Sequence, residues 1–176
     1  MKNTPAAGAP GRTLRTSRGA SIDILEIDAD HVKAAYKNVL LMVWARRTLA
    51  DVYRRSGGYI QDLRASHPKG VCVFQLVEDT AIPPETDARD AMTELLQNPG
   101  ITQFSVVFEA TGFKAAAVRA IVHAGQALSR PKFSHAVHQS VAAAAAWHAG
   151  LSPELSASEL QEAVQAMREL HRTRHP

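Results

Sequence analysis

The stretch VVFEATGFKAAAVRAIVHAG, residues 106–125, carries the pattern that decides the fold. It opens with an apolar run suited to a covered strand and continues with apolar side chains at helical spacing. Thr111 and Gly112 stand at the corner between the two parts, and Lys114 lies just inside the helical part. The stretch therefore predicts a strand that runs directly into a helix.

The same alternation recurs along the chain. Apolar runs typical of covered strands occupy 36–45, 70–77 and 102–110, and 133–140 fits a short strand. A segment with helical character follows each of the four. This repetition predicts an α/β layered fold with right-handed crossovers. Before these runs, 21–27 alternates as a half-exposed strand does, whereas 28–35 fits either an extended segment or a short helical turn.

Length and composition restrict the classes of protein that the chain can belong to. Its 176 residues, 45% of them hydrophobic, suit one domain with a proper core. Cys72 is the only cysteine, which excludes an intrachain disulfide and a cysteine-based metal cluster. No segment approaches the roughly 20 apolar residues that cross a bilayer, and the first residues lack the apolar centre of a secretory signal. We expect a cytoplasmic protein without a transmembrane segment.

The positive charge of the chain is concentrated at its start. Residues 1–22 contain Lys2, Arg12, Arg15 and Arg18 and no acid, which gives +4, so the other 154 residues sum to −1 within the formal total of +3. A nearly neutral body argues against nucleic acid as the partner. We expect 1–21 to be a disordered basic tail, which could contact anionic lipid headgroups.

A separate amphipathic helix is expected at the end of the chain, within 151–176. Ser156 or Ser158 can cap it, and basic residues follow its last apolar position. Its apolar stripe consists of Leu160, Val164, Met167 and Leu170. The stripe can pack across the surface of its own domain, or it can bind a partner protein or a second copy of the chain.

Residues 22–150 resemble the STAS superfamily (sulphate transporter and anti-anti-sigma factor), in particular its divergent STAS-like bacterial members. The resemblance lies in the layout of strands near 36, 71, 103 and 133, each followed by a helix. It includes the closing sequence VHQSVAAAAAWHAG, residues 137–150, and the pair Gly112–Phe113 after a strand. It implies a mixed sheet of four to five strands with helices packed mainly on one side.

The resemblance also implies a function and a regulatory loop. Members of this family act mostly by binding a partner protein, sometimes a nucleotide or a lipid, and few are enzymes. In anti-anti-sigma factors a phosphorylated serine follows the strand that matches 71–77. Here that loop reads EDTAIPPET, so Asp79 and Thr80 are the nearest match and Thr80 is the candidate for phosphorylation, although the following serine and glycine are missing.

A second hypothesis is a small-ligand site at the carboxyl ends of the strands, where open α/β sheets bind ligands. Glu78, Asp79 and Thr80 follow one strand there, and Thr111, Gly112 and Lys114 form a corner that could hold an anion at a helix start. Neither a dinucleotide fingerprint nor a P-loop is present. Side chains three apart on a strand point to opposite faces, so His135 and His138 do not suit a metal.

The chain shows no catalytic set, and we expect no cofactor or metal. The first hypothesis is therefore a non-enzymatic regulatory or scaffolding protein that binds a partner protein or itself through a STAS-like domain. The alternative is a binder of a small anionic ligand, a nucleotide or a lipid at the strand carboxyl ends. A pocket at that edge of the sheet favours the alternative, whereas an exposed apolar helix face favours the partner-binding hypothesis.

Overall fold

A computed structural model of the chain describes residues 12–110 and 131–175, together with 116, 119, 120, 123, 124 and 127. The strands of its sheet are β1 (Thr13–Arg15), β2 (Ser21–Ile27), β3 (His31–Tyr36), β4 (Val39–Trp44), β5 (Val71–Val77), β6 (Ile101–Phe108) and β7 (Ser134–His138). The helices are α1 (Ala50–Ser66), α2 (Thr86–Leu95), α4 (Val141–Leu151) and α5 (Ala157–Arg174). The α/β class expected from the sequence is confirmed.

The sheet keeps its strands in chain order, from β1 at one end to β7 at the other. Strands β1 to β4 form an antiparallel meander, and β4 to β7 are parallel to one another. The segment 28–35, which the sequence left open, forms a turn and β3. Strands β2, β4, β5 and β6 therefore all end at the same side of the sheet, which we call the carboxyl edge.

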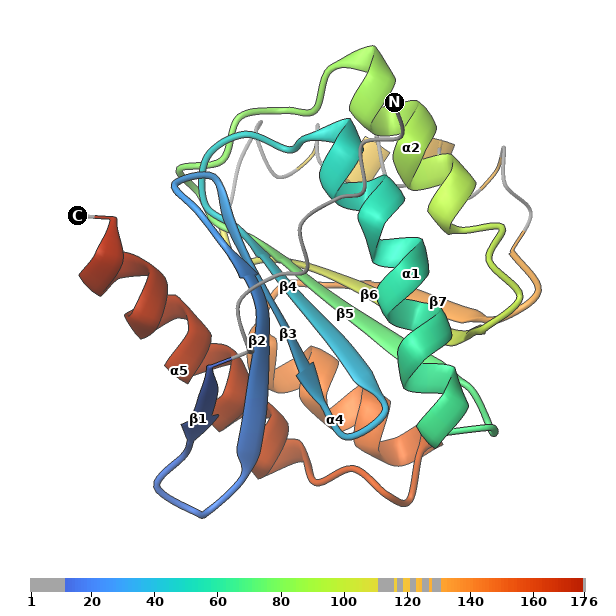
Figure 1. Cartoon of the computed structure of the whole chain (residues 1–176). Coiled ribbons are helices and arrows are strands. Elements are labelled where there is room, and N and C mark those ends of the chain that lie inside the picture. Colours follow the sequence, from blue (N-terminus) through green and yellow to red (C-terminus); the bar gives the residue numbers. More distant parts are fainter. Residues whose placement is uncertain are drawn as a thin grey trace, which may run out of the picture.

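Helices cover both faces of this sheet (Figure 1). On one face α1 and α2 pack over Leu40, Met42 and Trp44 of β4, and on the other α4 and α5 pack over Leu41 and Val43 of the same strand. Within the described residues the sheet has seven strands in a three-layer arrangement, which corrects the expected four to five strands with helices mainly on one side. The reason is that the central strands are apolar on both faces, and both faces must be buried.

The apolar stripe of α5 belongs to the second core. Leu160, Val164 and Met167 are fully buried against the sheet, and Leu170 packs beside them. At the start of α5, Glu159 accepts hydrogen bonds from the hydroxyl of Tyr36 at 2.6 Å and from Nζ of Lys37 at 3.0 Å. The stripe therefore packs across its own domain, which is the first of the two alternatives, and its binding of a partner protein stays a prediction.

The N-terminal segment is also more ordered than expected. Residues Thr13–Arg15 pair with β2, and Nε of Arg18 lies 2.8 Å from Oε1 of Glu162 on α5. The expected disordered tail therefore does not extend to residue 21, and residues 1–11 lie outside the described residues. None of the described helices is long and apolar enough to span a bilayer.

Candidate functional site

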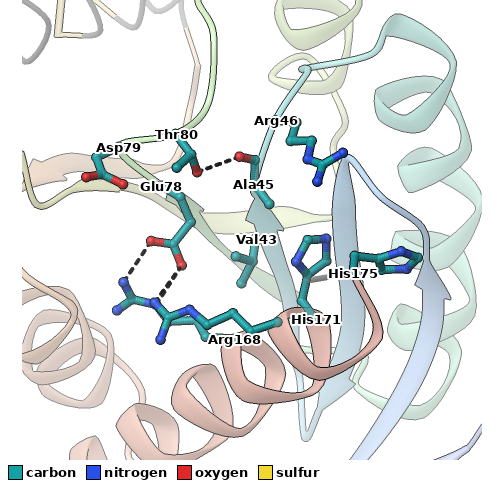
Figure 2. Close-up of a pocket in the computed structure, with 10 residues that line it drawn as sticks. Val43, Ala45, Arg46, Glu78, Asp79, Thr80, Arg168, His171 and His175 are labelled. Atoms are coloured by element: carbon teal, nitrogen blue, oxygen red, sulfur yellow. Dashed lines mark hydrogen bonds and ion pairs between the residues drawn. The ribbon is translucent and has the colours of Figure 1, made fainter.

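A pocket of about 230 Å³ opens at the carboxyl edge of the sheet (Figure 2). Three segments line it: the end of β4 with the two residues after it, the loop 78–80 after β5, and the last two turns of α5. The turn between β2 and β3 lies at the same edge, because backbone N–H groups of Ala45 and Arg46 both donate to the carbonyl oxygen of Asp30. We call this site the carboxyl-edge pocket.

One wall of the pocket is fixed by Arg168 of α5. Its guanidinium donates two hydrogen bonds to the carboxylate of Glu78, at 2.6 and 2.7 Å, and a third to Glu109, at 2.9 Å. Glu109 follows β6 and also accepts from the backbone N–H of Val141 at the start of α4. Arg168 therefore connects α5 to the ends of two parallel strands. Its positive charge compensates the negative charge of Glu78.

The opposite wall is held by hydrogen bonds between the loops after β4 and β5. The hydroxyl of Thr80 donates to the carbonyl oxygen of Ala45 at 2.7 Å, and the backbone N–H of Ile82 donates to that of Arg46 at 2.8 Å. Asp30 receives a bidentate contact from Arg47, which holds the pKa of Asp30 below its usual value despite partial burial. These contacts orient the loop that presents Arg46.

His171 is the most unusual side chain in the pocket. It is 6% exposed, and its Nε2 has no hydrogen-bond partner among the described residues. Figure 2 shows its ring projecting from α5 between Val43 and His175, toward the loop of Arg46. Burial lowers the pKa of His171, which neighbouring backbone groups of Asp28 and Ala29 only partly offset. Leaving a buried polar nitrogen unpaired costs about 1–3 kcal/mol.

Some cationic side chains of the pocket are not closely paired with a carboxylate of a described residue and could contact a ligand. Arg168 is engaged with Glu78, whereas Arg172 approaches Glu78 only to 3.9 Å. Arg46 is exposed, and it forms no ion pair within the described part of the chain. His175 lies one helical turn after His171, and their ring centroids are 5.2 Å apart. Two arginines and two imidazoles therefore surround the cavity, a composition that suits an anion.

The structure brings together part of the predicted ligand site. Glu78, Asp79 and Thr80 line the carboxyl-edge pocket, as their place after β5 implies. Thr111, Gly112 and Lys114 lie outside the described residues. The hydroxyl of Thr80 donates to Ala45, although the residue itself is exposed; its phosphorylation stays a prediction.

Sequence reasoning missed the residues that α5 contributes. It interpreted the basic end of this helix only as a complement to the helix dipole. Both histidines belong to the i, i+4 spacing H-R-T-R-H, which places their side chains on one face of a helix. That spacing was the available signal, but only the packing of α5 against β3 and β4 shows that this face meets the carboxyl edge.

A buried charged cluster lies elsewhere, between the sheet and α1. Nζ of Lys33 is fully buried, donates to the carbonyl oxygen of Val52 at 2.9 Å and lies 3.4 Å from Glu26. Burial lowers the pKa of Lys33 to about 8. Glu26 also binds His31 and Arg55, and these contacts hold its pKa far below the usual range although burial acts in the opposite direction. Full enclosure of the amine leaves a substrate no access, so we interpret the cluster as structural.

A second buried cluster has the connectivity of a catalytic triad. Nε2 of His148 lies 2.8 Å from the hydroxyl of Ser105, and its Nδ1 lies 2.8 Å from Oε1 of Gln103. Because an amide oxygen only accepts, Nδ1 donates and Nε2 accepts from the serine. Ser105 and His148 are both completely buried, and His148 packs against Phe74 and Trp147. A nucleophile needs contact with its substrate, so this arrangement satisfies core polar groups instead.

Comparison with known proteins gives no relative from which a function could be transferred. No family model matches the chain, no curated protein does so, and no solved structure does so. The resemblance to STAS domains therefore stays a prediction, and the function has to be argued from the carboxyl-edge pocket itself.

Proposed function

We propose that this protein binds a small anionic ligand in the carboxyl-edge pocket. The observation that supports this most directly is His171, a nearly enclosed imidazole that lines the cavity together with Arg46 and Arg172 and whose Nε2 has no hydrogen-bond partner among the described residues. An anion in this cavity would lie beside one imidazole and two guanidinium groups, which favour negative charge. The position of the pocket agrees with the general placement of ligands beyond the carboxyl ends of parallel strands.

The size of the pocket limits the ligand. A volume of about 230 Å³ corresponds to roughly seven or eight water molecules at about 30 Å³ each. It lies just below the roughly 300 Å³ at which pockets for drug-sized ligands begin. The site therefore suits an anionic group with a short organic part, and a dinucleotide is too large to be enclosed there.

The partner-binding hypothesis gains no exposed apolar stripe from α5. The stripe of α5 is buried, and among the described residues the large exposed apolar side chains are Ile82 and Leu151. Binding of a protein partner through a STAS-like domain remains a proposal that rests on the layout of the chain. The small-ligand function has a specific site, and for that reason we place it first.

Titration calorimetry at pH 6 with a panel of small anions, namely sulfate, inorganic phosphate, short dicarboxylates and sugar phosphates, tests this function. We expect at least one of them to bind and to raise the unfolding temperature, since a ligand that binds only the folded state stabilises it. Arg46→Ala and Arg172→Ala should each weaken binding about ten-fold, the loss expected for one charge-assisted hydrogen bond.

Lys69→Ala is the matched control, because it removes the same charge from an exposed residue just before β5, at the other side of the sheet. This variant should bind the ligand as the parent does. Absence of binding by every anion of the panel would contradict the proposed function. Equal weakening by Lys69→Ala would show a general charge effect and would also contradict a specific pocket.

A further inference from the structure

Resting on the proposed function, we infer that the ligand's anionic group is a tetrahedral dianion of the phosphate or sulfate class, that protonated His171 donates to it, and that binding takes up a proton. The starting point is the geometry of the donors around the cavity. Arg46 comes from the loop after β4 and His171 from α5, on two sides of the cavity (Figure 2), and Arg172 is also part of α5. A tetrahedral oxyanion presents oxygens in several directions, whereas a carboxylate presents two in one plane.

The charge balance of the pocket favours a dianion. Its lining contains three arginines against Glu78 and Asp79, which leaves one net positive charge before either histidine is protonated. Protonation of His171 adds a second. A group with two negative charges therefore balances this net charge of two.

A neutral imidazole donates from one nitrogen only, whereas the protonated ring donates from both and carries a positive charge. Burial lowers the pKa of His171, which keeps the ring neutral at neutral pH in the absence of ligand. A bound dianion acts in the opposite direction and favours the imidazolium. Binding and protonation are then linked, and affinity increases as the pH falls.

The charged groups that face His171 from the surrounding elements are consistent with this linkage. Asp28, in the turn after β2, favours the imidazolium, and His175 on α5 opposes it. Glu78 and Asp79 after β5, Arg46 after β4 and Arg168 and Arg172 on α5 complete the set. The negative end of the α5 dipole, next to His171, also favours a proton on the ring. Binding of an anion should therefore favour the protonated form of the His171 ring.

Sulfate is the probe that isolates the proton uptake, because it stays a dianion between pH 5 and pH 8. Its dissociation constant should be measured by calorimetry across this range at constant ionic strength. For the full-length parent we expect the affinity to fall as the pH rises, with a slope approaching ten-fold per pH unit where one proton is taken up. Inorganic phosphate and a small phosphate monoester should also bind more weakly as the pH rises, after correction for their own titration.

Two variants identify the histidine that takes up the proton. His171→Gln keeps an amide donor but cannot titrate, so it should bind sulfate with a nearly flat pH profile. His175→Gln should retain the slope of the parent. Circular dichroism of both variants establishes that they are folded.

The outcomes separate this inference from the proposed function. If the parent binds no anion at any pH, the proposed function fails and the inference with it. If the parent binds sulfate with a flat pH profile, the ligand site stands and the proton-linked role of His171 is wrong. A slope that persists in His171→Gln and disappears in His175→Gln also overturns the assignment to His171. Tight binding of dicarboxylates with no measurable binding of sulfate or phosphate overturns the tetrahedral class.

Discussion

Arg168 holds Glu78 through two parallel hydrogen bonds, from Nε to Oε1 at 2.6 Å and from Nη2 to Oε2 at 2.7 Å, across a separation of 90 residues in the chain. Both side chains are largely buried, and the contact joins the last part of α5 to the end of β5. Bidentate pairs of this kind fix orientation as well as position. The pair therefore fixes the position of α5 against the end of β5, in one wall of the carboxyl-edge pocket.

Replacing Arg168 with Leu should lower the free energy of unfolding by roughly 3 kcal/mol, because the carboxylate of Glu78 is left largely buried without its partner. Urea denaturation monitored by circular dichroism measures this change. The double variant Arg168→Leu with Glu78→Leu should recover most of the loss, since it leaves neither charge unpaired. A double variant less stable than Arg168→Leu would contradict the view that the unpaired charge is the cause.

The buried stripe of α5 makes a second prediction about stability. Met167→Glu places a charge in the core over the sheet and should unfold the protein at a much lower temperature, without first dissociating an assembly. Gln165→Glu, at an exposed position of the same helix, should change the free energy of unfolding by at most about 0.5 kcal/mol. Light scattering combined with thermal melting tests both. A loss of mass at unchanged melting temperature would restore the partner-binding hypothesis for this stripe.

The order of the elements could be predicted because each covered strand is a continuous apolar run bounded by turn residues. The face that each helix covers could not be predicted in the same way. A run such as Val39–Trp44 is apolar on both sides, so it does not say which side meets α1 and which meets α5. Two consecutive glycines are unfavourable within a helix, yet α1 continues through Gly57 and Gly58.

The candidate site was only half predictable, because its two halves depend on different kinds of information. Glu78, Asp79 and Thr80 follow a strand end, and the direction of parallel strands places such residues at one edge. His171 and Arg172 belong to a helix about 90 residues later in the chain. Their position depends on the angle at which α5 crosses the sheet, which packing with β3 and β4 determines.

Two glycines should respond in opposite ways to alanine. Gly58 lies inside α1, and a Cβ there meets nothing within 4 Å, so Gly58→Ala should raise the free energy of unfolding by about 0.8 kcal/mol through helix propensity. Gly70 has φ +113°, and a Cβ there would overlap Cγ2 of Thr102. Gly70→Ala should therefore destabilise the protein by at least about 1 kcal/mol. Equal effects in urea denaturation would contradict these environments.

Mutation of Lys33 and mutation of Glu26, its buried partner, should change the free energy of unfolding by different amounts. Lys33→Met removes an amine that is costly to bury, and the carbonyl oxygen of Val52 still accepts from Ser56, so stability should change by at most about 1 kcal/mol. Glu26→Gln leaves Lys33 without its carboxylate and should cost roughly 3 kcal/mol. Urea denaturation at pH 7 compares the two. A larger loss for Lys33→Met would mean that the charged pair is itself a net source of stability.

The buried histidine of α4 makes the protein sensitive to acid. Burial, followed by the proximity of His138, lowers the pKa of His148 to about 3, so the folded protein keeps this ring neutral. In the unfolded chain the ring gains a proton below its ordinary pKa of 6.5, and the unfolded state then binds more protons than the folded state. Stability is therefore complete above pH 6.5 and falls as the pH decreases from 6.5 toward 3, by up to about 1.4 kcal/mol per pH unit for this group.

His148→Phe isolates this contribution. The variant loses the hydrogen bonds to Ser105 and Gln103 and is less stable at pH 7, but its free energy of unfolding should decline less steeply between pH 6.5 and pH 5 than that of the parent. His135→Gln, at an exposed position of β7, should keep the slope of the parent. Urea denaturation at intervals of half a pH unit gives these slopes. A parent and a His148→Phe variant with the same slope would show that His148 gains its proton in the folded protein, which would require that Ser105 and Gln103 rearrange around an imidazolium.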